Sequence, residues 1–298
     1  MRRGSAGIDG NDGKVTHSRH FLCSRSGVYL KYYGLTEPPF DITPNPRFLF
    51  YSTQHREAYN HLLFGIRERK GFVQLTGEVG AGKTTLCRAM LEQLDGQFAT
   101  ALILNPVLDP DQLMKAIAME FGLNVKGLDR LETVAAINEF LLELVGQGRD
   151  AVLIIDEAQD LTDELLEQVR LLSNLETDSR KLLQIVLMGQ PELRERLNNP
   201  KLKQLRQRIT VRYHLAPLSR FEVNQYIQHR LEVSGAQGAP YFTGPGLWRV
   251  YRYSHGIPRL VNAICDKALL AGFVNQREKI DYATVNRAVR ELEGETAG

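Results

Sequence analysis

The sequence predicts an α/β fold, a five-stranded parallel sheet with helices on both faces, followed by a small all-helical second domain. Short apolar runs alternate with helical patterns between residues 72 and 215, and strands separated by helices pair in parallel. A glycine-rich turn directly follows the first run. After Pro217 the strand signals stop, and helical periodicity continues alone toward the C-terminus.

The elements follow one another in a regular order. The expected strands are 72–76, 99–104, 151–155, 182–188 and 209–215. The expected helices of the first domain are 52–69, 84–94, 110–123, 131–145, 162–176 and a short one after Pro191. Those of the second domain are 219–233, 243–253, 258–273 and 281–292.

The N-terminal region divides into two parts of different composition. Residues 1–27 are rich in Gly, Ser, Asn and charge without periodicity, which predicts disorder. The segment 32-YYGLTEPPFDITPNPRFLF-50 mixes aromatic residues with prolines, which indicates an irregular segment packed against the rest of the protein. We therefore expect a disordered or mis-annotated extension at 1–28, the sheet domain at 29–216 and the helical domain at 217–298.

Composition limits the class of protein. The 298 residues are 43% hydrophobic and carry a net charge of +2, which fits a globular protein and not a strongly basic nucleic-acid coat. Three widely spaced cysteines show no ligand pattern, so neither disulfides nor zinc are indicated. The longest apolar run, 151–155, is far shorter than the ~20 residues of a membrane-spanning helix, and no secretory signal is present. We expect a cytoplasmic protein.

The glycine-rich turn, 77-GEVGAGKT-84, matches the pattern G-x-x-x-x-G-K-[ST]. Its glycines let the backbone curl until successive N–H groups point at phosphate oxygens. Lys83 is expected to reach the β- and γ-phosphates, and the Thr84 hydroxyl to bind Mg²⁺. The position of the motif between a strand and a helix supports nucleotide binding, with ATP and Mg²⁺ as the ligands.

An acidic pair, Asp156 and Glu157, follows the strand 151–155. Ligands of open α/β sheets bind at the carboxyl edge, where this pair leaves the sheet. We assign Asp156 to holding Mg²⁺ and Glu157 to polarising the attacking water. Adjacent acids also occur as ordinary helix N-terminal signals, but the phosphate loop favours the catalytic interpretation.

Further polar residues follow the later strands. Gln190 ends the fourth strand and is a candidate sensor of the γ-phosphate, its alternative being an ordinary turn residue before Pro191. The segment 194–212 carries seven cations against one acid. It can be a solvated basic face, a nucleic-acid patch or the source of an arginine finger for a neighbouring subunit. Arg208 is our first candidate for the arginine finger, and Arg206 is the second.

Arg259 opens a helix of the second domain, where it is expected to reach the nucleotide of its own chain or to be a plain surface arginine. Together these residues resemble the ExeA/GspA-like AAA+ ATPases of type II secretion, with relatives in pilus biogenesis (MshM-like proteins), from about Tyr29 to Leu292. The blocks that carry the resemblance are 32-YYGLTEPPF-40, TGEVGAGKTTL around Lys83, LIIDEAQDL around Asp156, LLSNLET at 171–177, GQPELR at 189–194, LRQRI at 205–209 and GIPRLVN at 256–262.

The resemblance implies a P-loop AAA+ domain with a helical lid, in which Gln190 is sensor 1, Arg206 or Arg208 the finger and Arg259 sensor 2. The expected ATP-binding residues are Gly77, Glu78, Val79, Gly80, Ala81, Gly82, Lys83, Thr84, Thr85 and Arg259. Full-length secretion members resemble this chain in their first half and continue into a transmembrane helix and a peptidoglycan-binding domain. Members usually start with a sequence like MYLxYYGL, so Val28 is expected to be the true start.

The leading interpretation is an ATPase that forms a ring or filament with ATP and remodels a secretion or pilus assembly complex. Its partners would be further copies of the chain and a membrane-bound assembly protein, which places it peripherally at the inner membrane. The alternative is a DNA-acting AAA+ regulator of the transposition or origin type. A scaffold with negligible turnover is disfavoured by Glu157, and a small-molecule kinase by the lack of an acceptor site.

Overall fold

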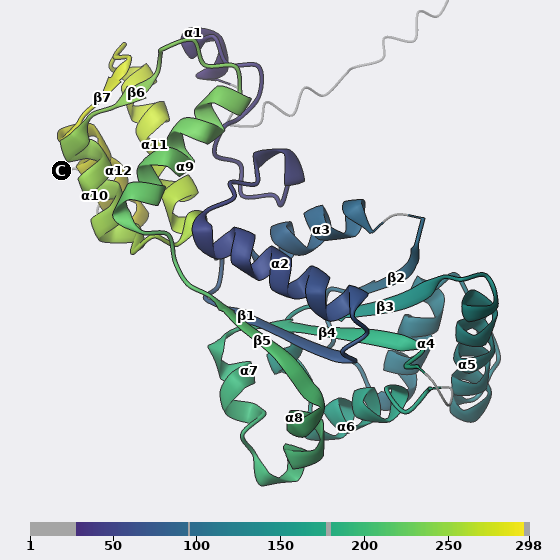
Figure 1. The fold of residues 1–298 in the computed structure, drawn as a ribbon. Helices are drawn as coiled ribbons and strands as arrows, with labels where there is room; N and C mark the ends of the chain where they lie inside the picture. The colour runs from purple at the N-terminus through teal and green to yellow at the C-terminus, as the bar shows by residue number, and fades with distance from the viewer. Residues whose placement is uncertain (1–27, 95, 177–179, 295–298) are drawn as a thin grey trace, which may run out of the picture.

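The computed structural model describes residues 28–94, 96–176 and 180–294. Of the extension expected at 1–28, residues 1–27 lie outside the described residues. The structure therefore does not test the prediction that the chain starts at Val28. Within the described part the chain forms an α/β domain and a helical lid (Figure 1).

The sheet domain has the predicted five strands, all parallel. They are β1 (Phe72–Gly77), β2 (Phe98–Ile103), β3 (Asp150–Ile155), β4 (Leu183–Gly189) and β5 (Ile209–Leu215). Their spatial order is β2-β3-β4-β1-β5, so β1 lies between β4 and β5 and its carboxyl end stands beside that of β4. The motifs that follow β1, β3 and β4 therefore meet at one edge of the sheet.

Helices cover both faces of the sheet, as predicted. One face packs against α2 (Thr53–Arg67) and α3 (Lys83–Gln93), and the other against α4 (Pro110–Glu120), α5 (Arg130–Gly146) and α6 (Asp163–Leu172) (Figure 1). Successive side chains of β3 serve the two layers in turn, since Val152 and Ile154 join the α2–α3 cluster while Leu153 and Ile155 join the other. A parallel strand buried on both faces explains the uninterrupted apolar run in the sequence.

Short elements connect the last strands. These are the turn η3 (Ala158–Asp160) after β3, then α7 (Pro191–Arg196), η4 (Pro200–Leu202) and α8 (Lys203–Arg208) between β4 and β5. Both α7 and α8 have six residues, too few to display a helical period. The sequence predicts α7 from Pro191 at its first position, but α8 has no such start signal and was missed.

The lid contains the four predicted helices, α9 (Arg220–Val233), α10 (Gly244–Ser254), α11 (Pro258–Val274) and α12 (Tyr282–Leu292). It is not entirely helical, however. The two-residue strands β6 (Tyr241–Phe242) and β7 (Lys279–Ile280) pair in parallel ahead of α10 and α12. Strands of two residues leave no alternation for sequence analysis to detect, so this small sheet was missed.

The first described residues pack on the lid. The Tyr29 hydroxyl donates to Asp266 Oδ1 over 2.5 Å, and the Tyr33 hydroxyl, from α1 (Leu30–Tyr33), donates to the Leu269 carbonyl over 3.1 Å. Both rings belong to the hydrophobic cluster of the lid. Residues 34–52, which include η2 (Pro46–Phe48) and are called the strap below, then lead back to α2. The strap therefore connects the lid to the sheet domain.

Candidate functional site

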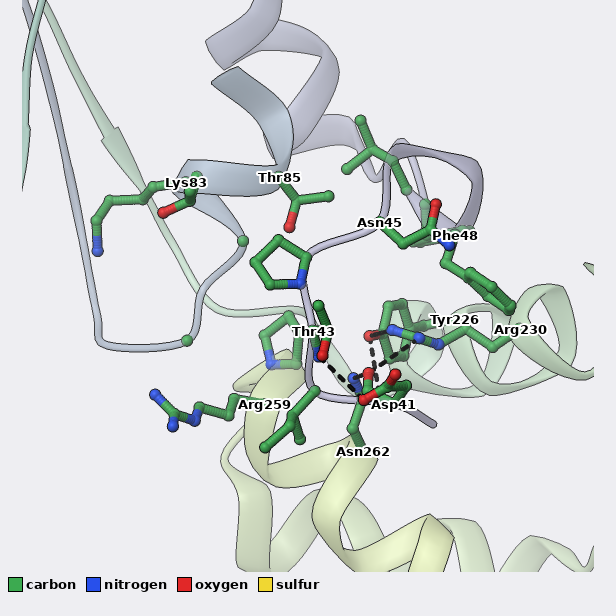
Figure 2. A pocket seen from close by; sticks show the side chains of 18 of the residues that line it. Asp41, Thr43, Asn45, Phe48, Lys83, Thr85, Tyr226, Arg230, Arg259 and Asn262 are labelled. Carbon is green, nitrogen blue, oxygen red and sulfur yellow. Dashed lines mark hydrogen bonds between the residues drawn. The ribbon is translucent and has the colours of Figure 1, made fainter. Parts of the chain in front are cut away.

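The site lies in a cavity of about 330 Å³ beside the carboxyl edge of the sheet. Most of its lining comes from residues 41–50 of the strap, the glycine-rich loop with the start of α3, and the lid helices α9 and α11 (Figure 2). From the loop, the lining residues are Val79, Gly80, Gly82, Lys83, Thr84 and Thr85. Glu157 lines the cavity from the end of β3. Residues far apart in the sequence thus enclose one space.

The glycine-rich loop has the curl that its sequence predicts. Gly80 and Gly82 have φ angles of 79° and 98°, in the left-handed region that glycine adopts without strain. Gly82 is the N-cap residue of α3. The first N–H groups of α3 have no partner within the helix and carry the positive end of its dipole toward the cavity. The loop and helix therefore make an anion cradle.

Lys83 is the first residue of α3 and is 6% exposed. Its Nζ donates to the Gly77 carbonyl over 2.7 Å and to the Glu78 carbonyl over 3.1 Å. Burial lowers the pKa of the Lys83 amine, while the nearby carboxylates of Glu157, Asp156 and Glu78 act in the opposite direction. The ammonium is held inside the loop, where it complements a phosphate charge.

The candidate magnesium ligands contact one another. The Thr84 hydroxyl donates to Asp156 Oδ2 over 2.5 Å, and Asp156 Oδ1 accepts from the Glu157 amide over 2.9 Å. Asp156 is 3% exposed. A hydroxyl and a carboxylate are the hard oxygen donors that Mg²⁺ takes in nucleotide sites, so this pair fits the expected ion.

Glu157 lies at the centre of a polar network that the sequence only partly predicts. Its Oε2 accepts from Gln159 Nε2 over 2.9 Å and from Gln190 Nε2 over 3.3 Å. Gln159 Oε1 accepts in turn from the main-chain N–H of Gln190 over 3.0 Å. Glu157 has a φ of 50°, a left-handed conformation that is uncommon outside glycine. The two glutamines therefore fix the carboxylate of Glu157 from two strand ends.

Gln159 was missed at the sequence level, although it stands within the block LIIDEAQDL. It extends the network to α7, because Arg196 donates to the Gln159 carbonyl over 2.5 Å and to Asp163 Oδ1 over 3.1 Å. The only signal in the sequence was that Gln159 lies two residues after Glu157. That spacing does not show that the Gln159 side chain faces the Glu157 carboxylate, because the direction depends on the turn η3.

Arg259 connects the lid to the glycine-rich loop. It follows Pro258 at the start of α11, lines the cavity, and its amide donates to the Gly80 carbonyl over 3.2 Å. A Cβ atom added at Gly80 would overlap the Cβ of Arg259. Gly80 is therefore needed both for its backbone conformation and for the close approach of the lid.

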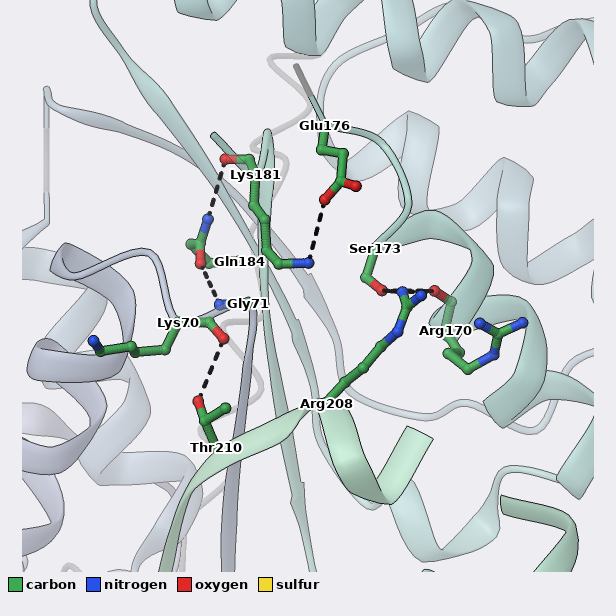
Figure 3. Close-up of polar contacts among 9 residues, drawn as sticks. All are labelled: Lys70, Gly71, Arg170, Ser173, Glu176, Lys181, Gln184, Arg208 and Thr210. Atoms are coloured by element: carbon green, nitrogen blue, oxygen red, sulfur yellow. Dashed lines mark hydrogen bonds and ion pairs between the residues drawn. The ribbon is translucent and has the colours of Figure 1, made fainter. Parts of the chain in front are cut away.

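The two candidate fingers lie elsewhere, since neither Arg206 nor Arg208 lines the cavity. Arg208 Nη1 donates to Ser173 Oγ over 2.6 Å and to the Arg170 carbonyl over 3.4 Å, at the C-terminal end of α6 (Figure 3). The guanidinium thereby contacts the C-terminal end of a helix that ends at Leu172, before the predicted 176. Arg206 makes a longer contact, 3.4 Å, to Asn198.

The basic segment 194–212 therefore has two kinds of cation. Arg196, Arg206 and Arg208 are partly buried and hydrogen-bonded within the chain. Four cations are exposed on α7, η4, α8 and β5, namely Arg194, Lys201, Lys203 and Arg212, of which Arg212 also donates to the Arg206 carbonyl over 2.6 Å.

The side of the cavity away from the phosphate loop was not predicted. Arg230 of α9 is 6% exposed and donates to the Pro39 carbonyl, to the Asp41 carbonyl over 3.2 Å and to the Tyr226 hydroxyl over 2.8 Å. Asn262 of α11 also donates to the Asp41 carbonyl, over 3.3 Å (Figure 2). These lid side chains hold the strap in place by its main chain.

Comparison with known proteins agrees with this geometry. An AAA domain model matches residues 66–197. The General secretion pathway protein A of Aeromonas hydrophila is 48% identical over 270 residues, which cover 90% of this chain and 49% of the relative. The chain thus spans about half the length of the curated relative it matches.

Solved structures share the fold at low sequence identity. The Aeropyrum pernix ORC2 protein is 18% identical with a TM-score of 0.65, over 87% of this chain and 72% of that one. The Drosophila ORC bound to DNA is 17% identical with a TM-score of 0.65, over 98% and 70% of the chains. The Thermotoga maritima RuvB branch migration motor reaches 0.54 at 18% identity, over 81% and 69%.

The fold, the anion cradle and the acidic pair at its side define an AAA-type P-loop ATPase. The similarity to the Aeromonas protein is more specific, because its 48% identity extends over 90% of this chain, and over that length the chain resembles the GspA-like AAA ATPases. None of the helices in the described part of the chain is long and apolar enough to cross a membrane.

Proposed function

We propose that the chain binds ATP with Mg²⁺ and hydrolyses it to drive assembly or remodelling of a secretion complex. The observation that carries this proposal is its 48% identity to a General secretion pathway protein A over 90% of its length. The convergence of Lys83, Thr84, Asp156 and Glu157 at one edge of the sheet supports the chemistry.

Each residue of the site has a proposed role. The loop amides and the Lys83 ammonium bind the β- and γ-phosphates, with adenosine on the strap side of the cavity. Thr84 and Asp156 would hold Mg²⁺, which neutralises phosphate charge when bound. Glu157 orients the attacking water, and Gln190, hydrogen-bonded to Glu157, responds to the γ-phosphate. Arg259 approaches the nucleotide from the lid.

The site is proposed to be completed by a second subunit. Arg208 and Arg206 stand outside the cavity of their own chain, so a role of either in catalysis requires a neighbour. In an ATP-bound ring or filament, one of them would stabilise the transition-state charge at the neighbour's γ-phosphate, an effect worth about 10³-fold or more in turnover.

A mixing experiment tests the finger. Arg208→Ala subunits have an intact ATP site, and Glu157→Gln subunits have an intact finger, so each alone should be nearly inactive while their mixture regains turnover. Lys203→Ala, on the same helix α8 and exposed, is the matched control and should hydrolyse ATP normally. If the Arg208 variant keeps full turnover, the test moves to Arg206→Ala. A mixture that stays inactive contradicts a finger supplied in trans.

The partner is proposed to be a membrane-bound secretion or pilus assembly protein. Glu157→Gln protein held with ATP should co-purify with such a component from membranes, and the Lys83→Ala variant should not. Equal recovery with both variants would contradict nucleotide-dependent binding.

A second candidate function, action on DNA, is favoured by the four exposed cations between Arg194 and Arg212. If those cations contact phosphates, DNA affinity should fall steeply with added salt and ATP turnover should rise with DNA. Replacing Lys201 and Lys203 by Ala should then weaken binding at every sequence tested. Turnover that is indifferent to DNA at low salt would leave the secretion function as the better supported.

A further inference from the structure

His55 is a buried histidine that faces the phosphate loop from a different element. It lies in the first turn of α2, is 4% exposed and lines the cavity. Its Nε2 stands 3.1 Å from the Ala81 carbonyl oxygen, and its Nδ1 stands 2.7 Å from Ser52 Oγ. A Cβ atom added at Gly82 would lie 3.1 Å from the same Nε2. The imidazole is therefore in contact with Ala81 and Gly82 of the glycine-rich loop.

The partners of His55 fix its tautomer. The Ala81 carbonyl can only accept a hydrogen bond, so Nε2 carries the proton and donates. In the neutral ring Nδ1 then accepts from the Ser52 hydroxyl. Burial lowers the pKa of His55, which favours this neutral form. Ser52 is in turn fixed as the N-cap of α2, where Oγ accepts from the His55 amide over 3.2 Å.

The hydrogen bond to Ala81 has a direct consequence for the cradle. In a planar trans peptide, the carbonyl of one residue and the N–H of the next point in opposite directions. Holding the Ala81 carbonyl toward α2 therefore directs the Gly82 N–H away from α2. Gly82 has unusual conformational freedom, with a φ of 98°, so this peptide would otherwise rotate easily.

We propose that His55 is a positioning residue for nucleotide binding, which orients the 81–82 peptide of the phosphate loop through its Nε2 hydrogen bond to Ala81. This inference rests on the proposed nucleotide site and adds to it a residue outside the loop motif. The lid reaches the same helix end, because Glu222 Oε1 of α9 accepts from the Thr53 amide over 3.2 Å. The loop, the N-terminus of α2 and the lid are thus linked by consecutive contacts.

The test compares two substitutions at one buried position. His55→Gln keeps an amide donor able to reach the Ala81 carbonyl, whereas His55→Leu fills a similar volume without a donor. We expect His55→Leu to raise the Kd for both ATP and ADP about tenfold, as one lost hydrogen bond would, and to change kcat by less than about threefold. His55→Gln should bind within about threefold of the wild type. Titration calorimetry and single-turnover assays give these values.

The controls separate a local from a general effect. His61→Leu changes an exposed histidine on the same helix and should leave Kd unchanged. Ser52→Ala keeps the imidazole but removes its orienting hydroxyl, and should raise Kd about threefold; it serves as the test if His55→Leu does not fold. Thermal unfolding of each variant reports its stability.

Several outcomes would overturn the inference. These are a wild-type Kd in folded His55→Leu, a His55→Gln variant as weak as His55→Leu, and an equal loss in His61→Leu. If His55→Leu does not fold, a wild-type Kd in Ser52→Ala has the same meaning. Failure of the wild type itself to bind ATP would instead contradict the proposed function, so the two failures are distinguishable.

Discussion

The two sides of the cavity are built in different ways. On the phosphate side, the reactive side chains come from the ends of adjacent strands, and their contacts connect β1, β3 and β4 within a rigid parallel sheet. On the strap side, an irregular segment is held by hydrogen bonds from the lid to its main-chain carbonyls. The phosphate side is thus fixed by secondary structure, and the strap side by tertiary contacts.

This difference separates chemistry from affinity. Changes among residues that surround the water-activating carboxylate should lower turnover and leave nucleotide affinity nearly intact, because those residues act in the transition state. Changes in the lid and strap should weaken affinity more than turnover.

Glu157→Gln should lower ATP turnover by about 10²- to 10⁴-fold, because the amide cannot take up a proton from water. The affinity for ATP should stay within about threefold, since the phosphate-binding residues are unchanged. Steady-state hydrolysis and calorimetric titration measure the two effects. Glu195→Gln, an exposed acid on α7, is the matched control and should behave as the wild type. Unchanged turnover in Glu157→Gln would remove this residue from catalysis.

Gln159→Leu should lower kcat about tenfold, because Glu157 loses one of its two amide donors and Gln190 loses an acceptor for its main-chain N–H. The KM for ATP should change little. Gln204→Leu, on the exposed surface of α8, controls for the loss of an amide. A KM effect larger than the kcat effect would contradict a role at the carboxylate and assign Gln159 to substrate binding.

The same difference explains what the sequence could predict. Lys83, Thr84, Asp156 and Glu157 stand in contiguous motifs after apolar strands, so their meeting at one sheet edge follows from the fold class. Arg230 is separated by 189 residues from Asp41, whose carbonyl it contacts. Every residue offers such a carbonyl, so no pattern of residue types marks the pair. His55 and Gln159 were missed for a related reason, since their partners become evident only in three dimensions.

Arg230→Met should weaken ATP binding about tenfold and lower the melting temperature, with little change in kcat. The carbonyls of Pro39 and Asp41 lose a charged donor, and the Phe48 ring loses a guanidinium that lies 4.7 Å from its centre. Arg252→Met, on the exposed face of α10, is the matched lid control. Equal losses of affinity in both variants, or a kcat loss without an affinity loss, would erase the contrast between the two sides.

The smallest effect concerns pH. Burial lowers the pKa of His55, opposed in part by the Ala81 carbonyl and Glu222, so below about pH 6.5 the unfolded chain binds a proton that the folded chain resists. The stability that His55 contributes to the folded state is therefore complete above that pH and is lost as the pH falls toward the lowered pKa of the folded state.

Urea unfolding at pH 7.5 and 5.5 should show a smaller loss of stability in His55→Gln than in the wild type. His61→Gln removes an exposed histidine of the same helix and should lose as much as the wild type. Because His229 also has a pKa lowered by burial, part of the pH dependence should persist in His55→Gln. An identical loss in His55→Gln and the wild type would show that His55 is not held neutral against the loop, and that the link between α2 and the phosphate side is weaker than its hydrogen bonds imply.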